Sequence, residues 1–158
     1  MPVRKKAVSS APKKKTSVVE AGGETVPVRK VVRKKKVAAE EAGGVFEGEA
    51  LAREALRFAD DKKAENAILL DVRGLSPVTD FLVICDGSST PHLRAIQNEI
   101  TGRMKQERGV RAYASHGTPD SGWMLIDFGD VVVHIFHAEK REFYGLEDMW
   151  NDAPRLTL

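Results

Sequence analysis

The chain has 158 residues, 30% of them charged, and a formal net charge of +2. Residues 1–42 carry 12 basic and 4 acidic side chains, a net charge of +8, whereas residues 43–158 carry 13 basic and 19 acidic ones, a net charge of −6. The lack of any apolar run of about 20 residues argues against a membrane-spanning helix, and a single cysteine, Cys85, excludes a disulfide framework within the chain.

Residues 1–45 are expected to form a disordered basic tail. They contain short Lys/Arg runs separated by Ala, Ser, Gly, Pro and Val, with no aromatic residue. Such a segment cannot bury enough apolar surface to offset its ordering entropy. Clustered Lys and Arg bind polyanions through counterion release, so the expected RNA contacts are Lys13, Lys14, Lys15, Arg33, Lys34, Lys35 and Lys36. A merely solubilising tail is the alternative.

The folded domain is expected over residues 46–158. Apolar residues at helical spacing predict a first helix over about 47–60. Two β-prone apolar runs, separated by a turn that contains Gly and Pro, predict strands over about 67–72 and 80–85. Cys85 ends the second run, so we interpret its thiol as buried and inert rather than catalytic.

A second helix is predicted over about 91–108 from the residues at its two ends. Asp86-Gly-Ser-Ser-Thr90 is rich in capping residues, a proline follows, and Gly109 suits the helix end. The Gly-Ser-Ser turn also resembles the phosphate-binding turn of nucleotidyltransferases, because backbone N–H groups at a helix start favour anions. Catalysis would further need converging carboxylates, with Asp71 and Asp80 as candidates, so an ordinary helix cap is the preferred interpretation.

The next part of the domain is predicted to be mainly β-sheet. A short strand is expected over 110–114, followed by a polar loop over 116–122. Strands over 123–128 and 131–136 flank Gly129-Asp130, a two-residue signature of a tight hairpin. The strand over 131–136 is apolar on both faces, which is typical of a central strand.

Short helices over 138–144 and 146–150 are expected to close the domain. The element order is then α-β-β-α-β-β-β-α, which predicts an α/β fold with a single mixed sheet of about five strands covered by helices. Phe143, Leu146 and Trp150 are predicted to pack inward from an amphipathic helix. Alternatively, this acidic stretch with interleaved aromatics meets a basic partner.

The residues do not assemble into a catalytic or metal-binding constellation, so we expect no enzyme activity, metal or cofactor. Asp127 and Asp130 are an odd number of positions apart, which on an extended strand places them on opposite faces. The same reasoning separates His134 from His137, and His134 within its apolar strand is interpreted as a core histidine.

Trp123 is the most informative large side chain, because it begins a strand beside a flexible polar loop. Along that strand Trp123, Leu125 and Asp127 share one face. The other face carries Met124, Ile126 and Phe128. If helices cover one face, the other exposes an aromatic residue of a type enriched at binding hot spots. Plain core packing of Trp123 is the alternative.

The domain resembles the ribosomal silencing factor family, also called Iojap, over residues 51–156. The motifs that carry the resemblance are Asp61-Lys-Lys-Ala-Glu65, Leu70-Asp-Val-Arg-Gly-Leu-Ser76, Thr79-Asp-Phe81, Gly122-Trp-Met-Leu-Ile-Asp-Phe-Gly-Asp-Val-Val-Val-His-Ile-Phe-His137, Arg141-Glu-Phe-Tyr144 and Leu146-Glu-Asp-Met-Trp150. The resemblance implies a homodimer and a nucleotidyltransferase-like fold that lacks an active site.

The resemblance also implies a function. Family members bind ribosomal protein number fourteen of the large subunit, obstruct joining of the small subunit and lower translation when nutrients are short. We therefore expect a cytoplasmic, non-enzymatic translation repressor whose acidic body meets a basic ribosomal protein. The expected contact residues are Trp123, Met124, Leu125, Asp127, Glu139 and Glu142.

Two other functions stay open at this point. One is a small nucleotidyltransferase or nucleotide-binding switch that uses residues 87–89. The other is a general RNA-binding protein that acts through its basic tail.

Overall fold

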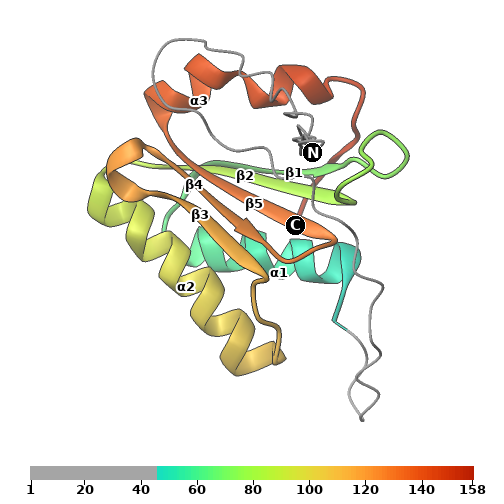
Figure 1. Ribbon diagram of the computed structural model, residues 1–158, viewed down its shortest axis with the longest axis horizontal. Helices are drawn as coiled ribbons and strands as arrows, with labels where there is room; N and C mark the ends of the chain where they lie inside the picture. Colours follow the sequence, from blue (N-terminus) through green and yellow to red (C-terminus); the bar gives the residue numbers. More distant parts are fainter. Residues whose placement is uncertain (1–45) are drawn as a thin grey trace, which may run out of the picture. The chain divides into compact units, whose positions relative to one another are not determined.

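The computed structural model describes residues 46–158, so the predicted tail and its RNA-contact candidates lie outside the described residues. The described chain forms one mixed sheet of six strands in the order β3-β4-β5-β2-β1-β6, with helices on both faces (Figure 1). The strands are β1 (Glu65–Asp71), β2 (Phe81–Gly87), β3 (Ala114–Thr118), β4 (Trp123–Asp127), β5 (Val131–His137) and β6 (Arg155–Leu156). This confirms the predicted α/β class and adds one short edge strand.

Strand β5 lies inside the sheet, as its apolar sequence predicts. It pairs in parallel with β2 and antiparallel with β4, and β1 continues the sheet antiparallel to β2. The β4–β5 connection is the predicted tight hairpin: the Phe128 backbone N–H donates to the Val131 carbonyl at 2.9 Å, and Gly129 has a φ of +89°. A positive φ of this kind suits glycine, which has no Cβ.

Helices α1 (Gly48–Asp61) and α2 (Thr90–Arg108) cover one face of the sheet (Figure 1). Their apolar stripes meet strand residues such as Val83, Val133 and Ile135 in the larger hydrophobic core. The predicted cap of α2 is confirmed, because the Ser89 hydroxyl accepts a hydrogen bond from the backbone N–H of His92 at 3.3 Å. Gly87 precedes this cap, where a Cβ would lie 2.6 Å from the Leu93 side chain.

Helix α3 (Ala138–Tyr144) and the 3-10 helix η2 (Leu146–Trp150) lie on the opposite face of the sheet (Figure 1). A second, smaller core forms beneath them from buried residues of β1, β2 and β5, among them Leu70, Ile84 and Phe136. Among the described residues, no helix is long and apolar enough to span a membrane.

Two predicted boundaries are wrong near β3. The strand expected over 110–114 lies at Ala114–Thr118, and the expected polar loop is mostly this strand followed by a 3-10 helix, η1 (Pro119–Ser121). Strand β3 is an edge strand whose side chains are mainly exposed, so it lacks the apolar alternation by which strands are predicted. Its backbone hydrogen bonds to β4 define it instead.

Two side chains near the second face also differ from expectation. Strand β2 continues through Asp86, which was expected in a loop, because the backbone there pairs with Phe136 of β5. The buried Asp86 carboxylate is paired with Arg141 at 3.0 Å. Phe143 points outward and is 76% exposed, whereas Tyr144 packs against the smaller core. Leu146 and Trp150 pack against that core as predicted.

Candidate functional site

The open face of β4 carries three of the predicted contact residues. Trp123, Leu125 and Asp127 are half-buried and alternate with buried Met124 and Ile126, which confirms the predicted division of the strand into two faces. Met124, also expected as a contact residue, is 2% exposed and belongs to the core under α1 and α2, so its side chain lies on the other face of β4. We call Trp123, Leu125 and Asp127 the β4 face.

Trp123 is held by three neighbouring rings. Its indole stacks on Phe136, with ring centroids 5.2 Å apart and planes inclined by 22°, and it contacts Tyr144 at a centroid distance of 4.5 Å. Its Nε1–H donates to Nδ1 of His134 at 3.1 Å. Trp123 therefore combines core packing with a partly accessible surface, which suits a rigid anchor for a partner.

His134 is a satisfied core histidine, as predicted. It is 6% exposed, and burial lowers its pKa to about 4. The imidazole is therefore neutral near pH 7. An imidazolium would carry N–H on both nitrogens and could not accept the indole hydrogen bond.

Asp127 has a local structural role in addition to its place on the β4 face. Its Oδ1 accepts a hydrogen bond from the backbone N–H of Gly129 at 2.7 Å, across the start of the β4–β5 turn. Aspartate side chains commonly stabilise turns in this way. A substitution that removes the carboxylate must therefore be tested for its effect on folding as well as on binding.

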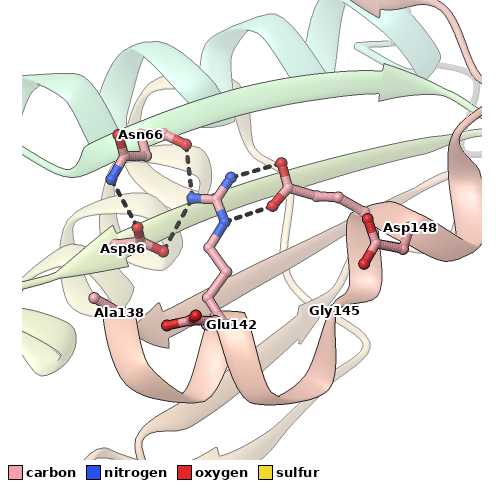
Figure 2. Close-up of a pocket in the computed structure, with 8 residues that line it drawn as sticks. Asn66, Asp86, Ala138, Glu142, Gly145 and Asp148 are labelled. Carbon is pink, nitrogen blue, oxygen red and sulfur yellow. Dashed lines mark hydrogen bonds and ion pairs between the residues drawn. The ribbon is translucent and has the colours of Figure 1, made fainter.

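Glu139 and Glu142 lie exposed on α3, on either side of a buried arginine, Arg141. The Arg141 guanidinium donates from Nη1 to Asp86 Oδ1 at 3.0 Å and to the Asn66 carbonyl at 2.7 Å. Its other nitrogens bond both carboxylate oxygens of Glu147, as Figure 2 shows. Arg141 thus attaches the α3–η2 segment to strands β1 and β2.

A hollow of about 470 Å³ borders this network and is lined largely by polar residues: Asn66, Asp86, Ala138, Arg141, Glu142, Gly145, Glu147 and Asp148 (Figure 2). The hydrogen bonds from Arg141 hold the pKa of the Glu147 carboxyl below its usual range, so this group is ionised at neutral pH. Asp86 and Glu147 share the charge of Arg141, and Glu142 and Asp148 add negative charge at the rim. The surroundings of the hollow therefore favour cationic groups.

The residues of the nucleotidyltransferase alternative lie at opposite ends of β2. Asp80 precedes the strand and Asp71 pairs with Phe81 at its start, whereas Ser88 follows its end. Seven residues of strand span roughly 20 Å, so these carboxylates cannot converge on a phosphate at the serine turn. Asp71 is moreover paired with Arg73, whose hydrogen bonds lower its pKa.

The one cysteine of the chain lies in the core. Cys85 is fully buried, and burial raises the pKa of its thiol to about 12, which keeps it protonated and inert as predicted. Within residues 46–158, no group of three or more His, Cys, Asp or Glu side chains is arranged to hold a metal ion. We take the β4 face and α3 as the candidate site, because they carry five of the six contact residues expected from the sequence.

The family model described as "Ribosomal silencing factor during starvation" matches residues 46–158. The chain belongs to the ribosomal silencing factor family. The resemblance found in the sequence is therefore confirmed, and the motif that contains Trp123 spans β4 and β5.

Individual relatives agree with this assignment. A ribosomal silencing factor of Halalkalibacterium halodurans is 42% identical over 104 residues, covering 66% of this chain and 88% of that protein. One of Bacillus subtilis is 42% identical over 99 residues, covering 63% of this chain and 83% of that protein. A crystal structure from Bacillus halodurans superposes with a TM-score of 0.59 at 40% identity, covering 68% of this chain and 97% of that chain.

The site includes residues whose roles the sequence did not reveal. Arg141, Asp86 and Asn66 are far apart in sequence but adjacent in space, and no local periodicity predicts such a network. Tyr144 belongs to a motif that carries the family resemblance, but its contact with Trp123 depends on how α3 returns over the sheet. In the sequence, the indication that Arg141 and Tyr144 matter was that the motif Arg141-Glu-Phe-Tyr144 matches the family.

Proposed function

We propose that this protein represses translation by binding the large ribosomal subunit through ribosomal protein number fourteen and sterically blocking joining of the small subunit. Membership of the ribosomal silencing factor family supports a role on the ribosome. The choice of surface rests on one observation: neighbouring rings hold Trp123 in place, and its side chain is still partly exposed on a face of the sheet. An anchor of this type contributes affinity without a large ordering cost.

The proposed contact surface consists of the β4 face together with Glu139 and Glu142 on α3. Leu125 extends the apolar area beside Trp123, and the three carboxylates supply negative charge. Ribosomal proteins are generally basic, so this charge would steer and orient the encounter, while the apolar residues supply most of the affinity. Steric repression requires occupancy of the intersubunit surface and no chemical step.

Three further elements of the proposal concern assembly and location. The family resemblance supports a homodimer in the cytoplasm. The basic tail, with a net charge of +8 over residues 1–42, would add sequence-independent contacts to ribosomal RNA. These contacts would strengthen binding but would not select the intersubunit surface.

Sedimentation of purified ribosomal subunits with the full chain, and with a truncated chain that begins at Phe46, tests the proposal. The truncation keeps the whole segment matched by the family model, residues 46–158, and this chain covers 97% of the solved Bacillus halodurans chain. We expect the truncated chain to comigrate with the large subunit and to lower the fraction of joined ribosomes. If it stays unbound while the full chain binds both subunits in a salt-sensitive way, the tail is a nonspecific RNA binder and the proposal fails.

A further inference from the structure

The indole N–H of Trp123 has a specific acceptor on the neighbouring strand. Trp123 on β4 pairs with Phe136 on β5, and His134 lies diagonally across, two residues along β5 on the same face. The 3.1 Å hydrogen bond from Nε1 to Nδ1 joins two side chains that are otherwise in tilted ring contact at 5.9 Å. Because an indole can only donate, Nδ1 of His134 must be unprotonated, and the neutral ring carries its proton on Nε2.

We propose that His134 is a positioning residue that fixes the orientation of the Trp123 indole on the β4 face for partner binding. This inference rests on the proposed function for its effect on affinity. The contacts with Phe136 and Tyr144 hold the plane of the indole between rings, but a flat ring turned over in that plane would keep much of this contact. The hydrogen bond to His134 is directional, and an indole turned over about its side-chain axis would lose it.

The surroundings of His134 suit a permanent acceptor. The ring is 6% exposed, and its strand lies between β2 and β4. Burial disfavours the imidazolium form, so the acceptor nitrogen stays free at neutral pH. A preoriented indole loses less conformational freedom on binding, which lowers the free energy cost of association.

Two substitutions separate the acceptor from the ring. His134→Phe keeps an aromatic ring and removes the acceptor, whereas His134→Asn removes the ring and keeps an oxygen close to the Nδ1 position. In both variants we would measure the indole ¹⁵N–¹H resonance of Trp123, assigned by its absence in Trp123→Phe, and the affinity for large subunits. We expect His134→Phe to shift this resonance and weaken binding roughly three- to tenfold, and His134→Asn to restore both.

Several outcomes would overturn the inference. An unchanged indole resonance in His134→Phe would show that His134 does not position Trp123, and a shifted resonance with unchanged affinity would show that the position does not matter for binding. If the wild-type chain binds no ribosomal subunit, the proposed function fails, and the resonance alone decides the positioning role. If His134→Phe does not fold, ¹⁵N spectra of wild-type His134 decide, because a proton on Nδ1 would contradict the hydrogen bond.

Discussion

Arg141 and Glu147 are joined by two parallel hydrogen bonds, from Nε to Oε2 at 2.8 Å and from Nη2 to Oε1 at 3.0 Å. The pair joins α3 to η2, while the remaining nitrogen of the guanidinium reaches Asp86 and the Asn66 carbonyl. Because Tyr144 ends the same helix, this network also fixes the ring that packs against Trp123. The charged network and the aromatic anchor are thus parts of one structural unit.

Replacing Arg141 with Met should destabilise the fold by about 3 kcal/mol, because removal of one partner leaves a buried charge uncompensated. That charge is Asp86, which is 3% exposed. The double variant Arg141→Met, Asp86→Asn should recover part of the loss, as measured by urea denaturation. Arg73→Met, which breaks the exposed pair with Asp71, is the control and should change stability little. If Arg141→Met and Arg73→Met lose a similar amount of stability, the buried Arg141 network has no special role.

Leu125 and Met124 are neighbours on opposite faces of β4, so they provide a matched pair. Leu125→Ala should weaken binding to the large subunit while the free energy of unfolding changes little, since this side chain is half-buried. Met124→Ala should cost about 2–5 kcal/mol of stability, because it creates a cavity in the core. Subunit cosedimentation and thermal unfolding measure the two effects. If Leu125→Ala binds as tightly as wild type, the choice of the β4 face is wrong.

Asp127 requires a substitution that separates its charge from its hydrogen bond. Asp127→Asn keeps an acceptor for the Gly129 N–H but loses the charge, whereas Asp127→Ala loses both. We expect the Ala variant to lose about 1 kcal/mol of stability and the Asn variant to lose less. Both should bind the large subunit more weakly, most clearly at low salt, where exposed charges are least screened. Wild-type affinity in Asp127→Asn would remove this carboxylate from the contact surface.

The sequence predicted those features that depend on local pattern. Ser89 and Gly109 define the ends of α2, and alternation along β4 separates Leu125 from Met124. Strand β3 was misplaced because an exposed edge strand is defined by backbone pairing, which leaves no hydrophobic pattern. Likewise, the contacts of Arg141 are long-range, so their formation depends on how the chain folds back over the sheet.

The orientation of α3 shows the same limit. Phe143 and Tyr144 are adjacent aromatics, and helical periodicity with loosely defined helix ends does not decide which one faces the sheet. Phe143 was expected inside, but the helix places Tyr144 against Trp123 and leaves Phe143 exposed. Residue types indicated a candidate binding surface, whereas the division of these side chains between surface and core depended on the three-dimensional arrangement.

Because His134 is buried, we expect the protein to lose stability as the pH falls from about 6.5 to 4. Burial lowers its pKa to about 4 in the folded chain, whereas the unfolded chain has the ordinary value of 6.5. Below pH 6.5 the unfolded chain therefore binds a proton that the folded chain does not, and the free energy of unfolding decreases by up to about 3 kcal/mol. Urea denaturation at several pH values measures this slope.

His134→Asn should remove this contribution, because asparagine does not titrate in this range. His116→Asn, at an exposed position on β3, is the control and should keep the slope of the wild type. Glu147 adds a separate loss at lower pH: its hydrogen bonds to Arg141 lower its folded pKa, so the stability they contribute is lost as the pH falls through that value. The free energy of unfolding of His134→Asn and of the wild type could instead fall equally steeply between about pH 6.5 and 4.5. In that case another group, and not the burial of neutral His134, causes the loss of stability in acid.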